Sequence, residues 1–118
     1  MDRHRRGVSE WLRTRRGRLQ TRGPSGWRDW NPWRSKLAAW LRVSGHDWPL
    51  ATDACVLYLG AAEGTTVSHV CDLCPEGRVA AIEVSATAMA ELLVVAERYQ
   101  NLLPVLTDAH FRHRGDTV

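Results

Sequence analysis

The chain has 118 residues, of which 44% are hydrophobic and 25% are charged. This balance is typical of a globular protein and argues against a disordered one, and the length suits one small domain. No stretch reaches the roughly 18 apolar residues that a membrane span needs, and the arginine-rich N-terminus has no apolar signal segment. We therefore expect a soluble, cytoplasmic protein with no membrane partner.

Positive charge is concentrated near the N-terminus. Residues 1–42 contain twelve of the sixteen Lys and Arg residues and three acids, whereas the rest of the chain contains four basic and ten acidic residues. Such an asymmetry favours contact with a polyanion, and nucleic acid is the first candidate. A flexible arginine-rich leader without a partner is the alternative, because charge alone does not distinguish the two.

The three cysteines are an odd number, which argues against a disulfide framework. Cys71 and Cys74 form a C-x-x-C pair, but a structural zinc site needs four ligands and only His69 lies nearby. A thioredoxin-like pair opens a helix, whereas this pair closes one before Pro75. We therefore predict no metal site and reduced, partly buried thiols.

Residues 1–26 are rich in arginine, interrupted by glycine and only weakly periodic, so we expect a basic, flexible arm. A short helix over SEWLRTRR, capped by Ser9, is the one element that we expect within it. The Gly-Pro-Ser-Gly run at 23–26 predicts a boundary, after which residues 27–118 form the folded domain.

A helix is predicted after this boundary. Asn31 is a suitable N-cap, Pro32 suits the first helical position, and Gly45 suits the end. Apolar residues at helical spacing form one face, namely Trp33, Leu37, Trp40 and Leu41. Arg34 and Lys36 fall outside that face.

The rest of the chain alternates between strand and helix patterns. We expect strands at 54–60, 78–84 and 102–109, a helix at 65–74, and a second helix at 86–99 capped by Ser85. The first strand is a continuous apolar run, typical of a strand covered on both faces, and Pro104 fits only near a sheet edge. This order predicts an α/β, Rossmann-like fold with three parallel strands and flanking helices.

The turn after the first strand is built from small residues, GAAEG at 60–64, and leads into two threonines. Ligands of such folds lie at the carboxyl ends of the strands, where small residues permit close approach and a helix start offers free N–H groups. Glu83 and Asp108 close the next two strands, where carboxylates suit ribose hydroxyls and an adenine amino group. Ordinary turn residues of an empty α/β protein are the alternative.

The residues alone leave the identity of the nucleoside cofactor open. A dinucleotide fold has a glycine where this chain has Ala62, and that methyl group hinders the approach of a pyrophosphate. S-adenosyl-L-methionine (SAM) contains adenosine without a pyrophosphate, so the turn favours this methyl donor without deciding for it. A nicotinamide-dependent enzyme stays open as an alternative.

Four blocks resemble archaeal-type fibrillarin, the ribose 2′-O-methyltransferase of box C/D ribonucleoproteins. They are WNPWRSKLAAW, VLYLGAAEGTTVSHV, PEGRVAAIEVS and NLLPVLTDAH, in that order over residues 27–110. The resemblance implies a class I SAM-dependent methyltransferase fold that acts on rRNA and tRNA. It also implies a box C/D guide RNA, a Nop-domain scaffold protein and a kink-turn-binding protein as partners.

The resemblance assigns roles to individual positions. Lys36 would be catalytic and Arg34 would contact the RNA backbone. Thr65 and Thr66 would hold the methionine end of the cofactor, Glu83 and Val84 its ribose, and Asp108 and Ala109 its adenine region. Gly60 would also belong to the cofactor site. Glu63 and Val84 depart from the serine and phenylalanine that are usual in the family.

The resemblance also implies that this sequence corresponds to the N-terminal, cofactor-binding half of a family member, since the match is lost after residue 110. The first strand would then be an exposed apolar edge. A non-catalytic RNA- or SAM-binding remnant is the alternative to a working methyltransferase.

Overall fold

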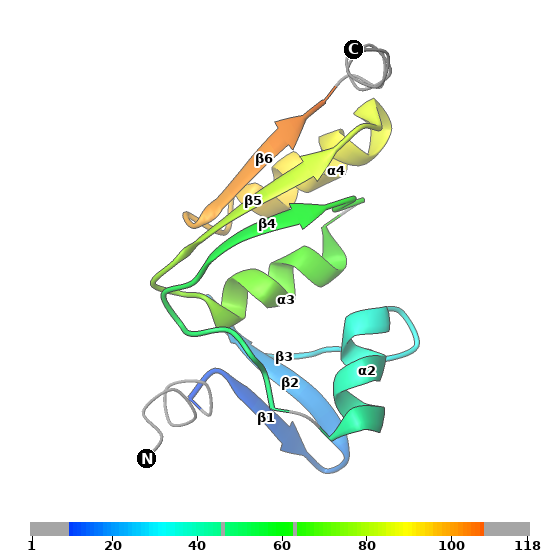
Figure 1. Ribbon diagram of the computed structural model, residues 1–118, viewed down its shortest axis with the longest axis vertical. Coiled ribbons are helices and arrows are strands. Elements are labelled where there is room, and N and C mark those ends of the chain that lie inside the picture. The colour runs from blue at the N-terminus through cyan, green and yellow to red at the C-terminus, as the bar shows by residue number, and fades with distance from the viewer. Residues whose placement is uncertain (1–9, 46, 63, 108–118) are drawn as a thin grey trace.

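The computed structural model describes residues 10–45, 47–62 and 64–107 (Figure 1). In this part of the chain two three-stranded sheets lie on either side of one helix, α3 (Thr65–Leu73). The first sheet is antiparallel and contains β1 (Leu12–Arg15), β2 (Arg18–Gly23) and β3 (Gly26–Asp29). The second is parallel and contains β4 (Cys55–Leu59), β5 (Arg78–Glu83) and β6 (Leu102–Leu106).

The expected flexible arm is wrong for residues 12–26, which belong to the antiparallel sheet. SEWLRTRR contributes β1 and no helix, and Ser9 lies outside the described residues. Arg16 and Gly17, with φ of 52° and 78°, form the left-handed turn between β1 and β2, a conformation that suits a two-residue hairpin. The expected boundary at 23–26 is the turn between β2 and β3.

The helix after the antiparallel sheet starts later than predicted. Asn31 does not cap it, because its Oδ1 accepts a hydrogen bond from the N–H of Trp33 in a separate turn. Ser35 is the N-cap of α2 (Lys36–Ser44), and Gly45 ends the helix at φ 69° as predicted. Trp33 therefore lies before the helix and is 94% exposed. The predicted apolar face is wrong at this residue, whereas Leu41 is buried as predicted.

The parallel sheet has the order β4–β5–β6, which confirms the predicted α/β fold with three parallel strands. Helix α3 connects β4 to β5, and α4 (Ala86–Ala96) connects β5 to β6. Ser85 caps α4 as predicted, since its Oγ accepts from the N–H of Ala88. Pro104 lies on the edge strand β6, where its missing N–H leaves no ladder bond unmade.

One face of the parallel sheet is not covered by described residues. Leu57 of β4 and Leu103 of β6 both lie beside Ala80 of β5, and they are 65% and 63% exposed. Leu59, on the same face, is 71% exposed. Among the described residues, β4 is therefore covered on one face and not on both as expected, and it lies at the edge of the sheet, as the fibrillarin resemblance implies. None of the described helices is long and apolar enough to cross a membrane.

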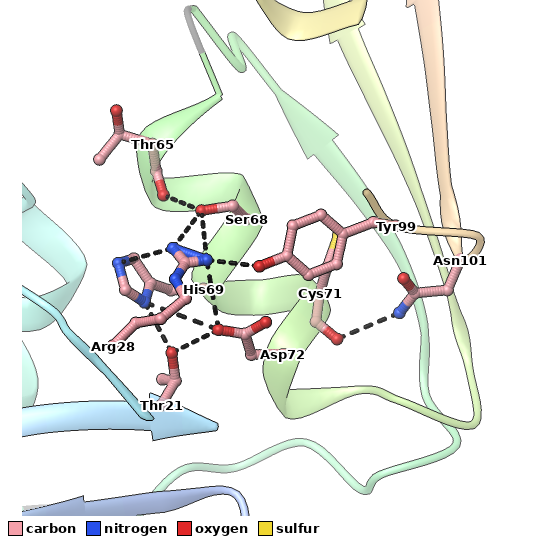
Figure 2. Close-up of polar contacts among 9 residues, drawn as sticks. All are labelled: Thr21, Arg28, Thr65, Ser68, His69, Cys71, Asp72, Tyr99 and Asn101. Atoms are coloured by element: carbon pink, nitrogen blue, oxygen red, sulfur yellow. Dashed lines mark hydrogen bonds and ion pairs between the residues drawn. The ribbon is translucent and has the colours of Figure 1, made fainter. Parts of the chain in front are cut away.

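Helix α3 joins the two sheets through buried polar contacts (Figure 2). Thr21 of β2 donates to Asp72 Oδ2 at 2.6 Å, and its Oγ1 lies 2.7 Å from Nδ1 of His69. Since the hydroxyl proton goes to Asp72, its oxygen accepts from His69, and Nε2 of the ring is left to accept from Arg28 at 3.2 Å. Trp30 stacks on the imidazole of His69 with centroids 5.0 Å apart. One cluster of buried apolar side chains includes Leu19 of β2, Val67 of α3 and Val79 of β5, so the two sheets share one core.

Candidate functional site

The turn after β4 contains two glycines that are required for different reasons. Gly60 has φ 75°, and a Cβ there would meet nothing within 4 Å, so the turn requires its backbone conformation. Its N–H donates to the carbonyl of Ile82 at 2.9 Å and ties the turn to β5. Gly64 has φ 96°, and a Cβ there would lie 3.1 Å from Leu92 and from Val95. Glycine at this position lets the start of α3 approach α4 closely.

The carboxylate of Glu83 organises the end of β5. Its Oε1 accepts from the N–H of Ala62 at 2.7 Å, and its Oε2 accepts from the N–H groups of Val84 and Ser85 at 3.0 and 2.8 Å. The hydrogen bond from Ser85 and then that from Ala62 lower the pKa of Glu83, so the group is an anion at neutral pH. A carboxylate has about four acceptor positions. One position on Oε1 is therefore left for a ligand hydroxyl beside the glycine turn.

The start of α3 faces the same end of the sheet. Gly64 occupies the N-cap and provides no side-chain cap, so the first N–H groups of the helix remain available to an anionic ligand group. Thr65 is exposed here. The hydroxyl of Thr66 instead donates to Ser35 Oγ at 3.1 Å and also bonds Tyr58. Of the two predicted threonines, Thr65 has the more accessible side chain.

The hydrogen bond between Thr66 and Ser35 brings the start of α2 to the start of α3. Ser35 is buried, and Lys36, the first residue of α2, is exposed next to it. Arg34 is exposed on the other side of Ser35. Sequence reasoning missed the role of Ser35, although a serine three residues before Ala38 at a helix start was a possible capping signal.

The remaining predicted residues lie at the ends of β5 and β6. Val84 is 53% exposed beside the Glu83 carboxylate. Thr107 donates its N–H to the carbonyl of Glu83 at 2.9 Å, which holds the chain after β6 against the end of β5. Asp108 and Ala109 lie outside the described residues, as does Glu63, so their predicted roles stay predictions.

The sequence model of the family described as Fibrillarin matches residues 12–116. The chain belongs to the fibrillarin family. It is 44% identical over 90 residues to the "Fibrillarin-like rRNA/tRNA 2'-O-methyltransferase" of Thermoplasma acidophilum, covering 76% of this chain and 39% of the relative. It is 50% identical over 84 residues to the protein of the same name from Archaeoglobus fulgidus, covering 71% of this chain and 40% of the relative.

Solved structures of family members have the same fold. A chain of a fibrillarin/Nop5p complex matches with a TM-score of 0.77 at 39% identity, covering 88% of this chain and 55% of that one. The fibrillarin of Aeropyrum pernix with natively bound S-adenosyl-L-methionine matches with a TM-score of 0.68 at 33% identity, covering 86% of this chain and 51% of that one. The chain thus spans about two fifths of the two curated relatives above and about half of these solved chains.

The C-x-x-C pair has no part in this site. Cys71 and Cys74 are buried at the end of α3, where the pair closes the helix as predicted. Burial raises the pKa of Cys71 to about 12 and that of Cys74 to about 11, so both thiols keep their protons. Burial, and then the charge of Arg28, lowers the pKa of His69 to about 3. Residues 10–45, 47–62 and 64–107 contain no group of three or more potential metal ligands.

Proposed function

We propose that this chain contributes the cofactor-binding part of a SAM-dependent enzyme that methylates ribose 2′-oxygens of rRNA and tRNA. The observation that carries the proposal is the Glu83 carboxylate, which three backbone N–H groups hold in place with one acceptor position left beside the glycine turn. The activity for which the Thermoplasma and Archaeoglobus relatives are named supports the choice of reaction.

The residues present fit S-adenosyl-L-methionine. Glu83 would accept from a ribose hydroxyl, and the uncapped start of α3 at Thr65 would receive the carboxylate of the methionine end. Gly60 leaves open space where a side chain would hinder approach. Val84 would cover the ribose, with Asp108 and Ala109 near the adenine. When bound, the cofactor supplies an electrophilic methyl group.

Lys36 is the residue that we assign to the reaction centre. It is exposed at the start of α2, and the bond between Ser35 and Thr66 holds that start next to the cofactor turn. Its ammonium group would orient the 2′-hydroxyl and offset the negative charge that develops on the oxygen as its proton leaves. Arg34, exposed two residues earlier, would hold the RNA backbone.

We further propose that the chain acts in the cytoplasm with a box C/D guide RNA, a Nop-domain scaffold protein and a kink-turn-binding protein. The similarity to a chain of a fibrillarin/Nop5p complex supports the scaffold partner. The guide RNA and the kink-turn-binding protein rest on family membership alone.

A non-catalytic RNA- or SAM-binding module is the second candidate. The exposed apolar face of the parallel sheet, with Leu57 and Leu59, favours it, because among the described residues this face lacks the cover that parallel sheets usually have on both sides. Transfer of a labelled methyl group from SAM to guide-directed RNA distinguishes the two candidates. Binding without transfer would favour the second.

The test is calorimetric titration of S-adenosyl-L-methionine into the purified chain. We expect saturable binding that weakens at least about tenfold, or about 1.4 kcal/mol, in Glu83→Ala. Glu91→Ala, which removes an exposed carboxylate from α4, is the matched control and should bind as the parent does. Circular dichroism checks that each variant is folded, because Glu83 also holds the turn.

Two outcomes would contradict the cofactor assignment. One is no heat from a folded parent protein, and the other is equal binding by the parent and by a folded Glu83→Ala variant. Tighter binding of NADH than of S-adenosyl-L-methionine would favour the nicotinamide-dependent alternative instead.

A further inference from the structure

We propose that the outer face of the antiparallel sheet binds single-stranded RNA. This face is made by Arg13, Arg15, Arg18, Arg22 and Trp27. The choice of RNA among polyanions rests on the function proposed above, whereas the surface itself follows from the strand register.

The register places the arginines together. Arg15 lies directly opposite Arg18, and Arg22 lies directly opposite Trp27. Because Arg18 and Arg22 alternate along β2, and Arg13 and Arg15 along β1, the four arginines and Trp27 share one face. The other face carries Leu19, which is buried, and Thr21, which bonds α3. Because successive side chains of a strand point to opposite faces, the arginine face is the one turned away from α3.

Side-chain contacts across the three strands hold this face in order. Arg13 donates from Nε to Gln20 Oε1 at 2.8 Å, and Gln20 donates from Nε2 to Asp29 Oδ1 at 2.7 Å. Arg18 donates to Asp29 Oδ2 at 3.1 Å and is 73% exposed. Among the strand residues that the structure describes, Asp29 is the one acid on this face, and it offsets one of the four arginines. The face is therefore strongly cationic.

Aromatic rings lie among the guanidinium groups. The guanidinium carbon of Arg13 lies 3.9 Å from the ring centroid of Trp27, and that of Arg22 lies 5.5 Å from the ring centroid of Trp11. Alternate residues of a strand are about 7 Å apart and neighbouring strands about 5 Å apart, so the guanidinium groups can reach successive phosphates. Arginine planes and aromatic rings also stack on unpaired bases. This combination matches single-stranded RNA better than an acidic protein, which offers carboxylates without flat bases.

The surface is tied to the proposed reaction centre. Arg42, in the last turn of α2, donates to the carbonyl of Gly17 at the tip of the β1–β2 hairpin. Lys36 begins the same helix. Helix α2 therefore connects the sheet that carries the arginine face to Lys36, the residue that we assign to the reaction. RNA bound on this face would be held in a fixed position relative to Lys36, which would help to orient a long substrate.

The test compares two charge-reversal variants in a fluorescence anisotropy titration with a short, labelled single-stranded RNA of mixed sequence. Arg15→Glu with Arg22→Glu changes the proposed face. Arg78→Glu with Arg98→Glu makes the same change in net charge at exposed positions outside it. We expect the first variant to bind RNA at least about tenfold more weakly. The slope of log K against log salt concentration should become smaller in magnitude by about 1.4, because two phosphate contacts are lost at about 0.7 each. The second should lose less than about twofold.

Equal weakening in the two variants would overturn the proposal, because net charge alone would then explain binding. Tighter binding to a labelled poly-glutamate peptide than to RNA would overturn it in favour of an acidic protein partner. Circular dichroism must show that both variants are folded, and both should bind S-adenosyl-L-methionine as the parent does. If the parent fails to bind that cofactor but shows the expected RNA result, only the proposed methyltransferase function is contradicted.

Discussion

The antiparallel sheet and the parallel sheet both pack one face against the shared core, but their other faces have opposite chemistry. The antiparallel sheet turns arginines outward, Arg15 and Arg22 among them, while Leu19 is buried. The parallel sheet turns leucines outward, with Leu57, Leu59 and Leu103 more than half exposed. An antiparallel sheet commonly meets water on one side, whereas parallel strands are usually apolar on both faces. The outer face of the antiparallel sheet is therefore suited to contact with water, whereas the outer face of the parallel sheet is apolar and suited to burial.

The junction between the sheets should be the most sensitive part of the fold. Trp30 is 1% exposed and packs on His69 and Trp48, so Trp30→Ala should lower the free energy of unfolding by about 3–5 kcal/mol. Trp33→Ala is the matched control, because Trp33 is 94% exposed, and its effect should stay within about 0.5 kcal/mol. Urea denaturation followed by circular dichroism measures both. Similar effects of the two substitutions would show that the sheets do not share a core around Trp30.

The same junction should make stability depend on pH. The pKa of His69 is about 3 in the folded protein against 6.5 as its ordinary value, so on acidification below about pH 6.5 only the unfolded state takes up this proton. The free energy of unfolding should therefore fall by up to about 1.4 kcal/mol per pH unit from His69. Asp72 opposes this loss, since burial raises its pKa and the folded state takes up that proton more readily.

His69→Gln isolates the histidine and leaves Asp72 in place. The stability advantage of the parent over this variant should shrink between about pH 6 and about pH 4.5, above the range in which Glu83, with its lowered pKa, adds its own loss. Urea denaturation at several pH values measures the difference. A constant difference over this range would mean that His69 titrates alike in the folded and unfolded states.

The open face of the parallel sheet should tolerate change best. Leu57→Thr with Leu59→Thr replaces two exposed side chains by polar ones that suit a strand, so stability should change by no more than about 0.5 kcal/mol per site. Self-association, followed by light scattering at increasing concentration, should fall because the apolar patch is smaller. A large loss of stability would show that this face is packed against other parts of the chain. Leu92→Ala, in the buried core, is the contrasting control.

Local residue chemistry was sufficient for much of the parallel half. The apolar runs predicted the three parallel strands, and Ser85 predicted the start of α4. Outside this half, Gly45 predicted the end of α2 in the same way. The order of strand and helix patterns also located Glu83 at the end of β5. These features depend on neighbours within a few residues, and such signals are legible along the chain.

The antiparallel sheet was missed for the opposite reason. Its arginines and glycines look like a disordered segment, and its structure depends on contacts that are distant in sequence, such as Thr21 with Asp72, 51 residues apart. The sequence pattern at Asn31 suits a helix cap because the turn that this residue forms uses the same side-chain chemistry as a cap. Family blocks did point to Lys36, but the bond from Thr66 to Ser35 that holds its helix near the cofactor turn needed the folded chain.

The amino-acid sequence by itself was therefore sufficient to predict the α/β class, the family and the carboxylate at the end of β5, because each of these depends on short sequence patterns. The packing of the two sheets on α3 decided the rest. It ordered the arginine-rich segment, buried His69 and left one sheet face open, because burial and charge depend on which distant segments meet.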